Sequence, residues 1–365
     1  MKKFNLLVLA LIFSLFFTAC GNSHTELVED NLDFEQLIDD GYIENIDTLL
    51  ENMNDKNIII LGEHHGVSEN FDIVLDIINS IETKKLNLVV EYSPAYAFML
   101  NNYLKTRDDD LLYKVFENSK GTFIHTKESI KLYQNIKKIS DSNKDIEIIG
   151  IDQDFVIENI ILALETLNDE RFLSDIENIN SAKDIDSLIK SLESFVNKTK
   201  DLDSDKKMNE DVIKIAQGVE ALLKNPKGDK NRDFAMYELF KRFVDPKIKT
   251  LCLLGGSHVL NLNNPNSEHN FKDLVSKDEQ FKDKLLIGLI FYFDSKYMNA
   301  DGSIMDLNSM FSKDSLIIKK ALEKDEQFVF FDMRKIPLTM NGENIYGLID
   351  YSIVLKNGTA TEVLK

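Results

Sequence analysis

The chain has 365 residues, 43% of them hydrophobic, and a formal charge of −19 at pH 7. That charge repels nucleic-acid phosphates and anionic lipid surfaces, so neither is an expected partner. Two cysteines, Cys20 and Cys252, are too few for a disulfide framework or a cysteine-based zinc site. The length and the apolar content predict a substantial core in one large domain or two ordinary ones.

Residues 1–19 have the pattern of a secretory signal peptide. Two lysines precede an apolar run that is too short to span a membrane and that ends in small residues. The sequence Phe17-Thr18-Ala19-Cys20 resembles a bacterial lipobox, which predicts a lipid anchor on Cys20 and a polar tether over 20–33. The expected location is the cell envelope, outside the cytoplasm and membrane-anchored through this lipid. An ordinary signal peptide followed by a chance cysteine is the alternative.

Residues 34–154 alternate between apolar strands and amphipathic helices. The predicted strands are 57–61, 86–91 and 146–151, and Ser68 is the expected N-cap of the helix after the first. Ser93 and Pro94 predict the N-cap and first position of the next helix. Two more helices are expected before the third strand. Strands that are apolar throughout indicate a parallel sheet covered on both faces.

Residues 155–248 contain only helical patterns and predict an all-helical insertion or cap. The stretches DIDSLIKSLESFVNK and MNEDVIKIAQGVEALLK show the clearest helical spacing. Residues 249–365 return to strands, at 249–254, 285–293, 327–331 and 351–355. The predicted fold class is therefore α/β, with a mostly parallel central sheet flanked by helices and interrupted by the helical insertion.

Polar groups follow the predicted strands where each one ends. The carboxyl ends of parallel strands meet at one edge of a sheet, where ligands bind in open α/β folds. A glutamate that closes an apolar run such as LNLVVE is partly desolvated, so it must be paired or used. Helix capping, a polar loop or a tight turn could also explain polar residues at these positions. The polar strand-end residues are Glu63 and His65, Glu91, Asp152, His258 and Asp332.

The motifs, taken in order, resemble those of the erythromycin esterase family and, more distantly, the Tiki/TraB and haem-binding lipoprotein groups. The resemblance extends from about residue 57 to 363. It rests on ILGEHHGVSENF, LVVEYSPAYAFMLNNYL, IIGIDQDF, NRDFAMYELF, LCLLGGSHVLN, FVFFDMR and GLIDYSIVL. It implies a hydrolase in which a histidine activates water against an ester, lactone or amide bond of a small-molecule substrate.

The resemblance also implies roles for individual residues. His65 would be the base, with Glu63 and Glu91 orienting it, while His258 and Arg232 would polarise the carbonyl or stabilise the oxyanion. No Gly-x-Ser-x-Gly elbow is present, so a serine acyl-enzyme is disfavoured. The residues expected to support the site or bind substrate are His64, Asp152, Asp332 and Tyr92.

Two departures from the family pattern leave room for a different function. A single residue, His64, separates Glu63 from His65 where the family has two, and the chain has no tryptophan. The shorter spacing resembles the Gly-Glu-x-His of haem-binding lipoproteins, for which Tyr92 and Tyr96 are candidate axial ligands. A metal-dependent peptidase of the Tiki/TraB type is also compatible, with two carboxylates and two histidines around a divalent ion. So is a retained fold whose site has lost turnover.

Overall fold

The computed structural model describes most of the chain after the predicted signal peptide. The described residues are 33–51, 56–142, 144–202, 207–226, 231–260, 270–307, 315–337, 339–340, 343–344 and 347–364. The predicted signal peptide and Cys20 lie outside these ranges. Within them, no helix combines the length and the apolar character that crossing a membrane requires.

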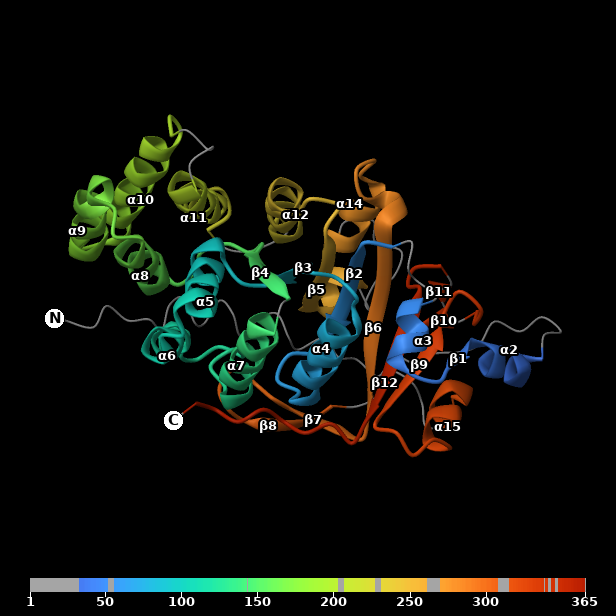
Figure 1. Ribbon diagram of the computed structural model, residues 1–365. Coiled ribbons are helices and arrows are strands. Elements are labelled where there is room, and N and C mark those ends of the chain that lie inside the picture. The colour runs from blue at the N-terminus through green and yellow to red at the C-terminus, as the bar shows by residue number, and fades with distance from the viewer. Residues whose placement is uncertain are drawn as a thin grey trace.

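The fold is built on an eight-stranded, mostly parallel sheet, which confirms the predicted fold class (Figure 1). Strands β12, β6, β2, β5, β3 and β4 are parallel neighbours in that order, whereas β9 is antiparallel to β12 and β1 is antiparallel to β9. All seven predicted strands are present. In sheet order the strands are β1 (Tyr42–Ile43), β9 (Phe328–Asp332), β12 (Tyr351–Lys356), β6 (Leu285–Phe293), β2 (Ile58–Glu63), β5 (Lys249–Gly255), β3 (Lys85–Val90) and β4 (Asp145–Gly150).

Helices cover both faces of the sheet, which explains why its strands are largely apolar on both sides. Successive side chains of a strand point to opposite faces. Accordingly, Ile59 and Leu61 of β2 join one apolar cluster and Ile58 and Ile60 join the other. The first cluster is covered by α4 (Glu69–Ser80), α5 (Pro94–Thr106) and α7 (Lys127–Asp141). The second is covered by α12 (Arg232–Phe243), α14 (Phe271–Lys277) and α15 (Leu316–Leu322).

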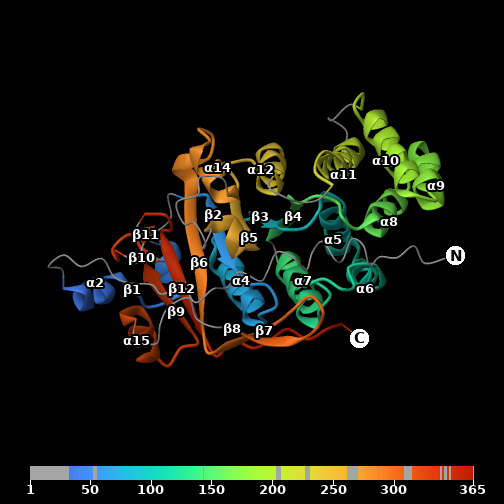
Figure 2. The same ribbon diagram turned by 180° about the vertical axis from the view of Figure 1, so that it is seen from behind.

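The described residues between 155 and 248 form helices and no strand, as the sequence predicts. They are α8 (Ile157–Leu167), the short η1 (Glu170–Phe172), α9 (Leu173–Ser181), α10 (Ile185–Thr199), α11 (Lys207–Lys224) and α12. Helices α8 to α11 lie at one end of the molecule, and α2 (Phe34–Gly41) and α15 lie at the other (Figures 1 and 2). Helices α3 (Ile46–Glu51) and α6 (Asp109–Glu117) complete the helices of the first half.

The two predicted helix caps have different outcomes. Ser93 caps α5, since its hydroxyl accepts the backbone N–H of Tyr96 at 3.3 Å and Pro94 opens the helix. Ser68 is not a cap, and the prediction was wrong. Its backbone is already helical and its side chain makes no capping bond, while its N–H donates to the carbonyl of Thr359. A tertiary contact thus replaces the local one.

Two small elements near the carboxyl edge of the sheet were not predicted. Strands β7 (Ser295–Met298) and β8 (Ile304–Leu307) form a hairpin directly after β6. The C-terminal tail, residues 357–364, then runs back across the loops that follow β2 and precede α7. Its Thr361 N–H donates to the carbonyl of Gly66, and its Glu362 carbonyl accepts the N–H of Lys127. The tail therefore ties two loops of the first half together.

Candidate active site

Most of the polar strand-end residues meet at the carboxyl edge of the sheet. Glu63 ends β2, Glu91 follows β3, and Asp152 lies two positions beyond β4. His258 lies in α13 (Gly256–Val259), which begins where β5 ends, and α12 contributes its first two residues. We call this group the carboxyl-edge cluster; its members are Glu63, His65, Glu91, Asp152, Arg232, Asp233 and His258.

His65 lies between two carboxylates. Its Nδ1 is hydrogen-bonded to Glu63 Oε1, and its Nε2 is 3.7 Å from Glu91 Oε2. The ring also lies against Phe123, with 5.5 Å between ring centroids. A Cβ at Gly255 would lie 3.1 Å from both Glu91 Oε2 and His65 Nε2, so a larger residue there would press on both side chains. The side chain of His65 keeps 23% exposure, so it is not fully buried.

Glu91 is the most connected carboxylate of the cluster. It accepts the Gly255 N–H at 2.7 Å and Arg232 Nη2 at 2.5 Å, and it lies 3.2 Å from His258 Nε2. Burial would raise the pKa of Glu91, but the positive charges of His258 and Arg232 hold it well below its usual range. Glu91 is therefore ionised at neutral pH, and its negative charge acts on each of these neighbours.

Arg232 joins two carboxylates that come from different strands. Its guanidinium donates to Asp152 through Nε at 3.2 Å and Nη2 at 2.7 Å, in the bidentate geometry that arginine favours. Burial alone would lower the pKa of Arg232, but Asp152 and Glu91 raise it. Since Arg232 opens α12, this ion pair also fastens the end of the helical segment to the sheet.

Both histidines of the cluster are stabilised in their charged forms. Burial would lower the pKa of His65, but Glu63 and Glu91 raise it to about 9. Burial opposes charge on His258 too, yet Glu91 and Asp233, which is 2.5 Å from Nδ1, raise its pKa to about 10. At neutral pH the two charged histidines therefore join Arg232 in the cluster, and all three lie within reach of its carboxylates.

His64 points away from the cluster. Its ring packs edge-to-face on Tyr297, with centroids 4.4 Å apart, and lies near Tyr292. Burial lowers the pKa of His64. The two adjacent histidines therefore occupy different environments, and only His65 lies among the carboxylates.

Asp332 does not reach the cluster, which corrects the placement expected from the sequence. Because β9 runs antiparallel to β12, its last residue pairs with Tyr351, the first residue of β12, at the opposite edge of the sheet. There Asp332 accepts two hydrogen bonds from the guanidinium of Arg334, at 2.8 and 2.9 Å. The sequence of a strand shows where it ends but not its direction.

Tyr92 and Tyr96 belong to a buried aromatic group beside the cluster. Their ring centroids are 4.7 Å apart, and Tyr96 packs on Phe116 at 5.6 Å. Burial raises the pKa of Tyr92, and the charges of Glu63 and Glu91 add to this effect. Only 3% of Tyr96 is exposed, so it does not fit the role of an axial haem ligand. Tyr92, partly exposed, lies close enough to those charges to support the site.

Three residues of the site and its surroundings were not predicted from the sequence. Asp233 holds His258 and follows Arg232 directly, so the NRDF motif itself contained the signal. Asn70 and Tyr292 hold Glu63 and the backbone of His64, but they look like a helix-surface amide and a strand aromatic. The pattern around them carries no sign of a polar network.

The cluster is a poor fit for a metal ion. In the part of the chain that the structure describes, no group of three or more His, Cys, Asp and Glu side chains is placed to hold one. The oxygens of Glu91 already accept from Arg232 and Gly255, and the guanidinium occupies the space between Glu91 and Asp152. We therefore derive no metal-dependent step from these residues.

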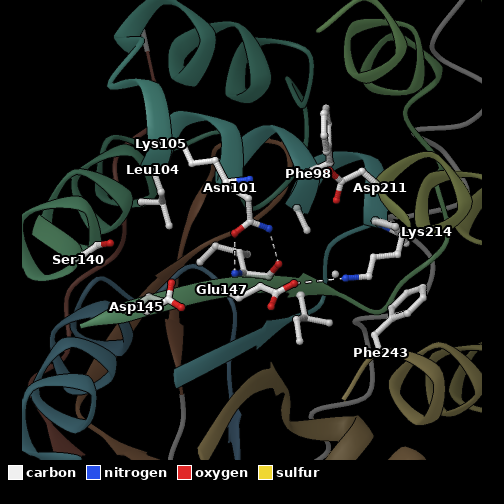
Figure 3. A pocket seen from close by; sticks show the side chains of 16 residues that line it. Phe98, Asn101, Leu104, Lys105, Ser140, Asp145, Glu147, Asp211, Lys214 and Phe243 are labelled. Carbon is white, nitrogen blue, oxygen red and sulfur yellow. Dashed lines mark hydrogen bonds and ion pairs between the residues drawn. The ribbon is translucent and has the colours of Figure 1, made fainter. Parts of the chain in front are cut away.

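A separate pocket lies at the outer edge of the sheet, between β4, α5 and α11 (Figure 3). Its volume is about 240 Å³, and no member of the carboxyl-edge cluster lines it. Asn101 fills part of this edge, since its amide bonds both the N–H and the C=O of Ile148, at 2.8 and 2.7 Å. Lys214 pairs with Glu147 at 3.3 Å. The polar strand-end residues are gathered in the carboxyl-edge cluster instead.

Comparison with known proteins supports the fold and leaves the family open. No family model matches the chain, and no curated protein sequence matches it either. A solved Bacillus cereus protein is similar over 93% of this chain and 100% of its own, with 17% identity and a TM-score of 0.65. A succinoglycan biosynthesis protein covers 97% of this chain and 98% of its own, with 14% identity and a TM-score of 0.60.

The third similar structure is a mutant of the erythromycin esterase EreC in its open conformation. It covers 87% of this chain and 95% of its own, with 12% identity and a TM-score of 0.59. At identities this low, the likeness establishes a shared fold and nothing finer. The chain is thus similar in fold to an esterase over most of its length.

Proposed function

We propose that the protein is a hydrolase that cleaves an ester or lactone, or an amide, in a small molecule. The observation that carries this proposal is the position of His65. Its ring lies between Glu63 and Glu91, within a cluster that also holds two cations, Arg232 and His258. The esterase-like fold and the order of the motifs support the same reaction class.

In the proposed mechanism, His65 acts as the general base. Glu63 holds the Nδ1 proton, so the neutral ring presents Nε2 to water. As the water oxygen attacks the carbonyl carbon, its proton passes to Nε2 and the carbonyl π electrons move to oxygen. Arg232 and His258 stabilise the oxyanion. Collapse of the intermediate breaks the bond to the leaving group, which takes the proton back from His65.

The test compares the two adjacent histidines. A panel of p-nitrophenyl esters and lactones would first identify a substrate that is turned over. His65→Ala should then lower kcat by about a hundredfold or more, the usual scale of general-base catalysis, while His64→Ala should cost much less. Equal activity of wild type and His65→Ala would exclude His65 as the base. A dead His64→Ala beside an active His65→Ala would reverse the assignment.

Haem binding and metallopeptidase activity predict different observables for the same purified protein. A haem-binding lipoprotein without turnover would give a Soret band on mixing with haem, and His65→Ala or Tyr92→Phe would remove it. A Tiki/TraB-type metallopeptidase would lose turnover in a chelator and regain it with a divalent ion. The hydrolase proposed above gives neither response.

A further inference from the structure

Asn70 and Tyr292 form a buried polar network with Glu63 of the carboxyl-edge cluster. Asn70 lies in the first turn of α4 and is 2% exposed, and Tyr292 lies near the end of β6 and is 5% exposed. Asn70 Nδ2 is 2.5 Å from Glu63 Oε2 and 2.8 Å from the carbonyl of His64. The Tyr292 hydroxyl is 2.8 Å from both Asn70 Oδ1 and the backbone N of His64.

Elementary chemistry fixes the direction of every bond in this network. A carboxylate and a carbonyl only accept, so the amide must turn its two N–H groups to Glu63 and His64. Its Oδ1 must then receive a donor, which the Tyr292 hydroxyl supplies. That hydroxyl, having given its proton, accepts the N–H of His64. Each group is satisfied, and reversing the amide would set its oxygen against the Glu63 carboxylate and the His64 carbonyl, which breaks both of those bonds.

The network constrains His65 in two ways. One oxygen of Glu63 is held by Asn70, which leaves the other for His65 Nδ1. Both the N–H and the C=O of His64 are also held, so the backbone that leads into His65 is fixed. The same two residues therefore set the position of the carboxylate and of the imidazole that it contacts.

We infer that Asn70 and Tyr292 are positioning residues, which hold Glu63 on Nδ1 of His65 and so leave Nε2 as the unprotonated nitrogen of the neutral ring. The inference concerns the tautomer and orientation of His65 and does not depend on the proposed hydrolysis. The hydrogen bond that one ring nitrogen of a histidine makes commonly decides which nitrogen carries the proton, and the residues that hold its partner support that bond.

The network also affects the charge on His65. The charged groups that face its ring are Glu63 from β2, Glu91 after β3 and Arg232 from α12. Removing the Asn70 amide frees Glu63 to turn away and leaves the other two in place. The stabilisation of the imidazolium by Glu63 then weakens, so the pKa of His65 should fall toward its ordinary value of about 6.5.

The test is a ¹⁵N-histidine NMR titration of the full chain, which needs no substrate. Comparison with His65→Gln assigns the His65 signals, and the ¹⁵N shifts above the pKa report the tautomer. In Asn70→Ala we expect the pKa of His65 to fall by about 0.5 or more and the single Nδ1–H tautomer to become a mixture. Tyr292→Phe, which keeps the ring and its packing, should give a smaller shift in the same direction.

Asn101→Ala is the matched control, since Asn101 also makes two backbone bonds but lies at the outer edge of the sheet. It should leave both the pKa and the tautomer of His65 unchanged. An unchanged His65 in folded Asn70→Ala would overturn the inference. If that variant does not fold, Tyr292→Phe decides, and an unchanged tautomer and pKa there would overturn it equally. Failure of the hydrolase proposal would leave these NMR results untouched.

Discussion

Replacing Arg232 with methionine should destabilise the fold strongly. Methionine keeps most of the apolar stem and removes the charge, which leaves Glu91 and Asp152 without their shared cation. The Arg232 side chain is 20% exposed, whereas those of Glu91 and Asp152 are 9% and 6% exposed. Breaking a buried ion pair from one side typically costs about 3–5 kcal/mol. We expect about 3 kcal/mol, because Glu91 keeps its bonds to Gly255 and His258.

The assay is urea unfolding of wild type, Arg232→Met and Arg107→Met, followed by circular dichroism at several pH values. Arg107 is a suitable control because it makes one ion pair, with Asp141, in which both partners are well exposed (67% and 35%). Its loss should change the stability little, since exposed pairs are screened by water.

The pH dependence adds a second check on the same variant. Burial would raise the pKa of Glu91, and His258 and Arg232 lower it. This depressed pKa contributes stability above the unfolded value of about 4.3 that is lost as pH falls through the folded value. The deficit of Arg232→Met should therefore be full at pH 7 and shrink below about pH 4. A deficit no larger than that of Arg107→Met, or one independent of pH, would show that Arg232 does not stabilise the fold through Glu91 and Asp152.

Three further predictions concern the base, the loop and the anchor. Because the pKa of His65 is raised to about 9, its neutral form is scarce at pH 7. Turnover should therefore rise about tenfold per pH unit and level off near pH 9. A rate that is flat from pH 6 to 9 would contradict this. Gly66→Ala should lower the free energy of unfolding in urea by about 2 kcal/mol or more. The φ angle of Gly66 is +83°, and the new Cβ would lie 2.1 Å from the Met298 carbonyl oxygen. An unchanged unfolding midpoint would contradict this prediction. For the proposed lipid anchor, Cys20→Ala should move the protein from the membrane fraction to the soluble one or block its processing, and unchanged partitioning and maturation would count against a lipobox.

Much of the fold could be predicted from the sequence because apolar patterning follows burial directly. The seven principal strands are largely apolar since helices cover both faces of the sheet, and Ser93-Pro94 marks the start of α5 through a local bond. The short elements were not predicted, because they do not follow from apolar patterning within their own sequence. The two-residue β1 and the β7–β8 hairpin depend on the neighbours they pair with, and these are set by the tertiary structure.

The site shows the same division between local and distant causes. Glu91 could be recognised because a charge that closes an apolar strand must have a partner. Asn70 could not, since an amide in the first turn of a helix looks like a surface residue until Tyr292 arrives, 222 positions later in the chain. Asp332 was misplaced because strand direction is decided by pairing and leaves no trace in the five residues of β9.

The tail over 357–364 separates the parts of the site in the order of their synthesis. Glu69, at the start of α4, accepts two hydrogen bonds from Thr359, and these two residues are 290 positions apart. At about 5–20 residues per second, a ribosome needs about 15–60 s to pass from one to the other. The loop that carries His65 is therefore synthesised well before the tail that contacts Glu69. A chain that stopped before Thr359 would contain every proposed catalytic residue and still lack the two hydrogen bonds that the tail donates to Glu69.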